Sequence, residues 1–153
     1  MTPVRRRLRT LATLELINIP LFAWVIFGVL DRPPAVPTLL GFGMFALLLV
    51  EGAAYWTAKL RRTGRPLPGL GLFRAARLLN PVLLAATLIV TVGTGAWLGA
   101  GLTVFAVLEY VNYFHVQLMH DTRADLHRLF TRGFRRSHLA RDLARWTVRS
   151  RAA

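Results

Sequence analysis

The sequence predicts an all-α integral membrane protein with four transmembrane helices, and three observations support this prediction. The chain has 153 residues, 54% of them hydrophobic, and these collect in four runs at residues 11–30, 36–60, 81–98 and 102–119. At 1.5 Å rise per residue each run spans at least about 27 Å as a helix, enough to cross a bilayer core. The runs are apolar all round, which argues against a soluble bundle. Basic residues collect at their flanks, as in multi-pass membrane proteins.

The first expected helix, residues 11–30, follows the basic segment MTPVRRRLRT. This arrangement is similar to a secretory signal peptide. The apolar run is too long for a signal-peptide core, however, and no small-residue cleavage site follows it, so we expect an uncleaved span. The connection 31–37, DRPPAVP, is short and rich in proline. It predicts a tight hairpin into the second helix, residues 36–60.

The connection between the second and third expected helices, residues 61–80, has two parts. Residues 64–71 are rich in glycine and proline, which predicts a turn. Residues 72–79, LFRAARLL, predict a short amphipathic helix on the membrane surface. Gly95 and Gly99 lie where the third and fourth helices meet, with a spacing that permits close helix approach. A tight turn explains these glycines equally well.

The chain beyond the bundle, residues 120–153, predicts a basic tail. Residues 120–132 and 135–149 indicate two helices separated by Gly133. The second helix has two faces, one apolar with Leu139, Leu143 and Trp146, and one basic with Arg141, Arg145 and Arg149. We expect it to lie on the anionic inner leaflet, although a helix that binds a partner protein shows the same pattern.

The charge distribution predicts the orientation in the membrane. The formal net charge is +13, and the basic residues lie before the first helix, between the second and third, and after the fourth. By the positive-inside rule, both termini and the 61–80 connection are cytoplasmic. We expect the plasma (inner) membrane of a bacterium, with anionic lipids as partners. Because the charges flank membrane helices, nucleic-acid binding is not predicted.

The two halves of the bundle show a weak similarity. Residues 51–60, EGAAYWTAKL, align with residues 109–118, EYVNYFHVQL, and share Glu, Tyr and Leu positions. A parallel repeat of two helical hairpins, related by an axis along the membrane normal, is therefore a hypothesis.

Three carboxylates lie inside the apolar runs: Glu15, Glu51 and Glu109. A charge at the centre of a membrane helix costs about 3 kcal/mol on insertion scales, so such residues are rare unless paired or used. By helical phase, Glu51 and Glu109 each share a face with the polar residues that follow them. We expect these faces to oppose each other across an inward-opening pocket, with Glu15 near its edge. The candidate ligand or ion pocket consists of Glu51, Tyr55, Glu109, Asn112, Tyr113, Gln117 and His120, with Glu15 and Asn18 as outer members.

A purely structural role is the alternative for these carboxylates. Glu51 can pair with Lys59 or Arg62 along its own helix, and Glu15 can reach back to the N-terminal arginines. The basic residues near the inner surface are also candidates for lipid head-group contacts. They are Lys59, Arg61, Arg62, Arg141 and Arg145.

The sequence gives no confident metal site and leaves the cofactor unknown. It has no cysteine, which excludes thiolate chemistry, cysteine-bound zinc and iron–sulfur clusters. Di-metal carboxylate bundles use Glu-x-x-His, whereas Glu15 and Glu109 are each followed by Asn at that position. Nucleotide-binding and hydrolase motifs are also missing.

Three functions fit the sequence. The first is transport of a proton, a cation or a small cationic solute by a homo-oligomer. The second is a membrane enzyme that acts on a lipid at the inner leaflet through Glu51 and Glu109. The third is an accessory subunit whose glutamates pair with a membrane partner. Enzymatic activity is thus left open.

Overall fold

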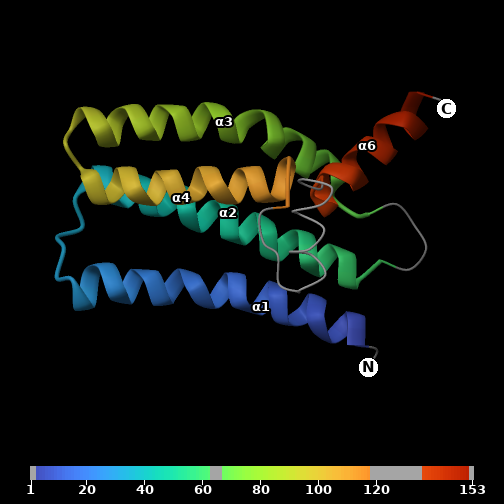
Figure 1. The fold of residues 1–153 in the computed structure, drawn as a ribbon, viewed down its shortest axis with the longest axis horizontal. Helices are drawn as coiled ribbons and strands as arrows, with labels where there is room; N and C mark the ends of the chain where they lie inside the picture. Colours follow the sequence, from blue (N-terminus) through green and yellow to red (C-terminus); the bar gives the residue numbers. More distant parts are fainter. Residues whose placement is uncertain (1–2, 63–66, 118–135, 152–153) are drawn as a thin grey trace, which may run out of the picture.

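The chain folds into long antiparallel helices, and the described residues contain no β-strand (Figure 1). The computed structural model describes residues 3–62, 67–117 and 136–151, with side chains up to residue 145 in the last segment. The predicted helix at residues 120–132 and the candidate residue His120 therefore lie outside the described residues. The helices are α1 (Pro3–Ala23), its π-helical continuation η1 (Trp24–Val29), α2 (Val36–Leu60), α3 (Leu70–Gly93), α4 (Trp97–Phe114) and α6 (His138–Arg151).

The observed helix bounds agree with the prediction for α2 and differ elsewhere. α1 begins at Pro3, so the basic N-terminal segment is helical. α3 begins at Leu70 and continues through Pro81, so the prediction of a separate surface helix at residues 72–79 is wrong. Proline inside a membrane helix is tolerated because neighbouring groups satisfy the freed backbone carbonyl. α4 ends at Phe114, and Val116 then pairs with Arg136 in an isolated antiparallel bridge.

α2 and α4 form the middle of the bundle. α2 packs against α1, α3 and α4, whereas α4 packs against α2, α3 and α6. α1 and α3 lie at opposite edges (Figure 1). One end of the molecule carries the N-terminus, the α2–α3 connection and α6, and we call it the basic end. The other end, with the connections at residues 30–35 and 94–96, is the hairpin end.

The glycines of the third and fourth helices have separate roles. Gly95 adopts a positive φ of 69° in the turn between α3 and α4, a conformation that favours glycine. Gly99 instead packs against α2, because a Cβ built on it lies 2.7 Å from the carbonyl oxygen of Pro37. A Cβ built on Gly41 lies 2.2 Å from the carbonyl oxygen of Gly99. The backbones of α2 and α4 are therefore in close contact at the hairpin end.

Among the residues that the structure describes, three helical segments are long and apolar enough to cross a membrane. They are Pro3–Val29, Val36–Leu60 and Leu70–Gly93, and α4 is not among them. Large apolar side chains on the outer faces of the bundle are exposed, including Leu16 on α1, Trp24 on η1, and Val82 and Ile89 on α3. Apolar surface of this extent suits contact with lipid rather than water. The chain thus has the features of a helical membrane protein.

Candidate functional site

A cavity of about 380 Å³ lies at the basic end, between α1, α2, α4 and α6. Its polar lining comes from side chains that are far apart in sequence, including Glu15, Tyr55, Lys59 and Tyr113. Its apolar lining includes leucines of α1 and the Trp56 ring. The volume is within the range of small-ligand pockets. The cavity is therefore large enough for a small ligand that has both polar and apolar parts.

Glu15 is held in the cavity wall by α4. The hydroxyl of Tyr113 donates a hydrogen bond to Glu15 Oε1. Tyr113 reaches this position because α2 has a glycine there. A Cβ built on Gly52 lies 2.4 Å from the Tyr113 hydroxyl oxygen, which leaves no room for a larger residue.

Glu109 lies close to this group without lining the cavity. It is half-buried on α4, one helical turn before Tyr113. Asn112 does line the cavity. Two carboxylates from different helices, Glu15 in the cavity wall and Glu109 one turn from Tyr113, therefore lie near the same tyrosine.

Glu51 has a different environment, between α2 and α3. The side-chain amide of Asn80 donates to Glu51 Oε2 at 2.7 Å, and Asn80 is only 2% exposed. Glu51 does not line the cavity. The structure therefore brings Glu109 together with Glu15, whereas the sequence had predicted Glu51 as its partner. The hydrogen-bond partners of Glu51 and Glu15 are Asn80 and Tyr113. They are not the basic residues expected if these carboxylates had a purely structural role.

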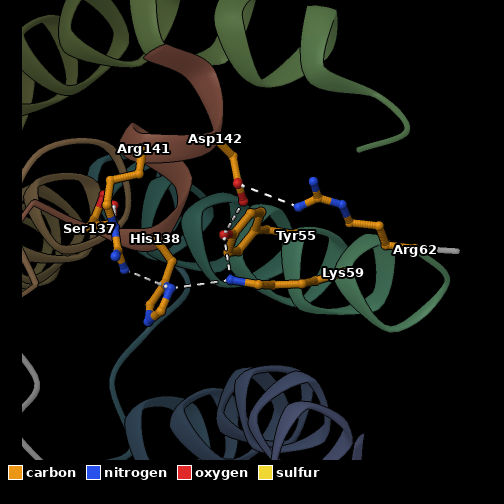
Figure 2. Close-up of polar contacts among 7 residues, drawn as sticks. All are labelled: Tyr55, Lys59, Arg62, Ser137, His138, Arg141 and Asp142. Atoms are coloured by element: carbon orange, nitrogen blue, oxygen red, sulfur yellow. Dashed lines mark hydrogen bonds and ion pairs between the residues drawn. The ribbon is translucent and has the colours of Figure 1, made fainter. Parts of the chain in front are cut away.

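The basic end of α2 is joined to α6 by a polar network (Figure 2). The Tyr55 hydroxyl donates to Asp142 Oδ2 at 2.9 Å and accepts from Lys59 Nζ at 3.2 Å. Arg62 forms an ion pair with Asp142 at 3.7 Å. Lys59 Nζ also lies 3.2 Å from His138 Nδ1, and an Arg141 nitrogen lies 2.9 Å from the same atom.

Ser137 fixes the start of α6. Its hydroxyl accepts a hydrogen bond from the Ala140 amide at 3.1 Å and donates to the Tyr113 carbonyl. Its own amide donates to the His115 carbonyl at 3.1 Å. Serine is a preferred N-cap because its oxygen satisfies an orphan amide of the first turn. This cap therefore joins α6 to the end of α4.

The apolar face of α6 packs on the bundle. Leu139 is 2% exposed and Leu143 is 4% exposed, and both belong to the core cluster that also contains Leu70 and Phe73. The prediction that this face lies on lipid is therefore wrong for these two leucines. The reason is that the ends of α2, α3 and α4 already provide an apolar surface, which the helix covers.

The remaining candidate residues are dispersed. Gln117 lines the cavity, Asn18 is half-buried outside it, and Arg61 and Arg145 are exposed. His115 Nε2 lies 3.1 Å from the Tyr110 hydroxyl oxygen. Burial, together with the Arg77 charge, lowers the pKa of His115.

Sequence reasoning missed several residues of this region. His138 and Trp56 line the cavity, and Asp142 is the acid that joins α6 to α2. The sequence could have indicated Asp142 as a contact residue, because it is an isolated acidic residue in a segment rich in arginine. Within the described ranges, no group of three His, Cys, Asp or Glu residues could hold a metal ion.

The site therefore combines Glu15, Tyr113 and the nearby Glu109 with a cavity whose lining includes His138 and Leu139 of α6. No protein family model matches the chain, and neither a curated protein nor a solved structure matches it.

Proposed function

We propose that this chain is a small membrane transporter that binds a proton or a small cationic solute at Glu15 and Glu109. The observation that carries the proposal is the position of Glu15, whose carboxyl lines a cavity and accepts a hydrogen bond from Tyr113, one helical turn from Glu109 on α4. Two carboxylates near each other in a membrane repel, and a shared proton or cation relieves that repulsion. Tyr113 orients the Glu15 carboxyl by donating to one of its oxygens.

The proposal includes a topology with four spans and cytoplasmic termini. α4 packs along α2 between α1 and α3, and its Phe105 and Leu108 side chains are exposed like those of the other helices. The positive-inside rule then puts the basic end, and with it the mouth of the cavity, in the cytoplasm. We expect a homo-oligomer, because four helices leave little room for a pathway through one protomer.

Thiol labelling tests the topology, since the chain has no cysteine of its own. Pro34 is exposed in the hairpin-end connection, and Gly71 at the basic end has no atom within 4 Å of an added Cβ. A membrane-impermeant maleimide should label Pro34→Cys in intact cells and Gly71→Cys only after permeabilisation. The reverse pattern contradicts the orientation.

A flux measurement in proteoliposomes tests the function. Glu15→Gln keeps the size of the side chain but removes its charge, so we expect at least a tenfold loss of proton or cation flux. Asp31→Asn is the matched control, because Asp31 lies at the hairpin end with φ of 46°, which asparagine tolerates. Flux that is equal in Glu15→Gln and wild type contradicts the proposal.

A lipid-directed enzyme is the second candidate, and the mixed lining of the cavity favours it. Leu8, Leu11 and Trp56 give the cavity an apolar wall, while Lys59 contributes a cation. This combination suits a lipid whose phosphate meets Lys59 and whose chain contacts the leucines. Native mass spectrometry of the purified protein distinguishes the candidates. A bound lipid that Glu15→Gln releases favours the enzyme, and a co-purifying membrane protein favours an accessory subunit.

A further inference from the structure

We propose that the hairpin end binds the phosphate group of a membrane phospholipid between the first turns of α2 and α4. A second cavity, of about 430 Å³, lies there, and we call it the hairpin-end pocket. Its lining combines Arg32, Thr38 and Trp97 with residues of both connections. The inference is independent of the transport proposal, because this pocket shares no lining residue with the cavity at the basic end.

The helices α2 and α4 begin side by side at this pocket. A Cβ built on Gly99, in the first turn of α4, lies 2.7 Å from the carbonyl oxygen of Pro37 in the first turn of α2. Neither helix has a side-chain cap at its N-terminus. Because each helix N-terminus carries about half a positive charge, the two starts together make this end of the bundle attractive to an anion.

The first turns also offer free amide donors. The first amide that bonds the carbonyl four residues back is that of Leu39 in α2 and that of Ala100 in α4. The amides of Thr38 and Leu98 come before these bonds and belong to the orphan donors of a helix start. Both residues line the hairpin-end pocket. Two helices therefore present amides to one ligand site.

The side chain of Thr38 is an independent sign that the pocket takes a ligand. Thr38 is only 8% exposed, yet its hydroxyl forms no hydrogen bond with the residues that the structure describes. Every fully buried side-chain oxygen or nitrogen in the described ranges has a partner. The Thr38 oxygen must therefore open to the pocket that the residue lines. Since hydroxyls in such positions are nearly always hydrogen-bonded, this one is available to a ligand.

Arg32 gives the pocket its preference for an anion. Residues 24–47 and 85–108 lie nearest this end, all of them described, and their charged side chains are Asp31 and Arg32. Asp31 is exposed and does not line the pocket, whereas Arg32 does. A guanidinium can donate two parallel hydrogen bonds to phosphate oxygens, and the indole of Trp97 can only donate. The lining therefore offers donors and a positive charge but no carboxylate.

The pocket lies at the level where a bilayer has its phosphates. The apolar spans α2 and α3 both have one end here, and the Trp97 side chain is 73% exposed. Tryptophan at the end of a span is typical of the head-group level. Leu30 and Leu98 add apolar lining, which suits the glycerol and acyl part of a lipid better than a free anion. The expected occupant is therefore a phospholipid.

Fluorine NMR of the full-length protein labelled with fluorotryptophan tests the site. The protein is held in dodecyl maltoside, a detergent without phosphate, and titrated with a short-chain phosphatidylglycerol. The chain has four tryptophans, and the Trp97→Phe variant assigns the Trp97 signal. We expect this signal to shift until the site is saturated.

Two further titrations identify the source of the phosphate. A diacylglycerol with the same acyl chains, and inorganic phosphate at the same concentration, should each give no saturating shift of the Trp97 signal. An equal shift with diacylglycerol means that apolar contact alone explains binding. An equal shift with inorganic phosphate means that the site takes a free anion. Either result overturns the proposal, as does a Trp97 signal that phosphatidylglycerol does not shift.

Side-chain variants test the donors. Arg32→Gln removes the guanidinium, and lipid affinity should fall about tenfold. Thr38→Val keeps the shape but removes the hydroxyl, so affinity should fall about fivefold. Arg9→Gln removes the same charge at the basic end and should leave the Trp97 titration unchanged. An equal loss in Arg9→Gln and Arg32→Gln assigns binding to overall charge and overturns the proposal.

A carboxylate at the start of α2 tests the amides. Ala35 is the N-cap residue, and its φ of −64° and ψ of 142° are those of an extended residue, the conformation in which aspartate caps a helix. Ala35→Asp should occupy the first-turn amides, so lipid affinity should fall about tenfold while the melting temperature does not fall. Ala35→Asn adds no charge and should keep more of the affinity. Unchanged lipid affinity in Ala35→Asp overturns the proposal.

Discussion

The two ends of the bundle are held together in different ways. At the hairpin end, α2 and α4 touch backbone to backbone through Gly41 and Gly99. The buried hydroxyl of Thr103 there bonds only its own helix, at 2.8 Å to the Gly99 carbonyl. At the basic end, separate elements are joined by side-chain contacts such as Tyr55 to Asp142. Steric fit therefore fixes one end, while the other depends on groups whose charge can change.

This difference suggests where the molecule can change state. A close-packed glycine contact has one arrangement, because neither backbone can move without losing contact along both helices. A network that includes an imidazole, an ammonium and a carboxylate responds to pH and to ligands. The cavity, Glu15 and α6 all lie at the responsive end. The hairpin end then acts as a fixed support for the site.

The largest expected effect is at the fixed end. A Cβ at Gly41 would overlap the Gly99 carbonyl at 2.2 Å, so Gly41→Ala must push α2 and α4 apart. Overpacking of this kind costs about 1–3 kcal/mol or more. The measurement is the unfolding free energy in mixed micelles. Gly43→Ala, two residues further along α2 with no atom within 4 Å of an added Cβ, should be no less stable than wild type. Equal stability of the two variants contradicts the steric account.

An intermediate effect is expected where α2 meets Tyr113. Gly52→Ala places a Cβ 2.4 Å from the Tyr113 hydroxyl, but the obstacle is the end of a side chain that can move. We expect the unfolding free energy to fall by about 1 kcal/mol. The flux should fall by a larger proportion than the unfolding free energy, because Tyr113 no longer reaches Glu15. Gly101→Ala on α4, where an added Cβ meets nothing within 4 Å, is the control. If the Gly52→Ala variant keeps wild-type flux, the contact of Tyr113 with Glu15 is not needed for transport.

The smallest expected effect is loss of the Asp142 charge. The Arg62 side chain is 37% exposed, and ion pairs with such exposure contribute about 0–1 kcal/mol. Asp142→Asn also keeps an oxygen that can accept from Tyr55. We therefore expect the protection of the α6 backbone amides, measured by hydrogen exchange, to fall by about fivefold at most. A much larger fall would make Asp142, rather than the buried leucines, the main anchor of α6.

The sequence predicted the helical membrane class and one helix in full. The second apolar run, residues 36–60, is observed as α2 with the same bounds, because prolines and basic residues mark both of its ends. The other predicted bounds were less accurate because helices continue into polar sequence. The arginines before residue 11 belong to α1, and residues 72–79 belong to α3. Hydropathy marks the apolar part of a helix and not its ends.

The site was predictable in part. Helical phase grouped Glu109 with Asn112, Tyr113 and Gln117, and the last three line one cavity. Phase within a helix cannot say which neighbouring helix lies opposite. The partner of Tyr113 is Glu15 because Gly52 leaves a passage past α2. The partner of Glu51 is Asn80 because α3 packs on that side of α2.

The sequence by itself determined that this chain is helical, apolar and strongly basic, with carboxylates inside apolar helices, because composition and periodicity are local properties. Only the tertiary structure decided which side chains surround each carboxylate, where the cavity lies and that residues of α6 line it. These features depend on helix rotation and on contacts between residues up to 98 positions apart, such as Tyr113 and Glu15. Packing selects such contacts by the fit of whole helix faces, which no single segment of the sequence specifies.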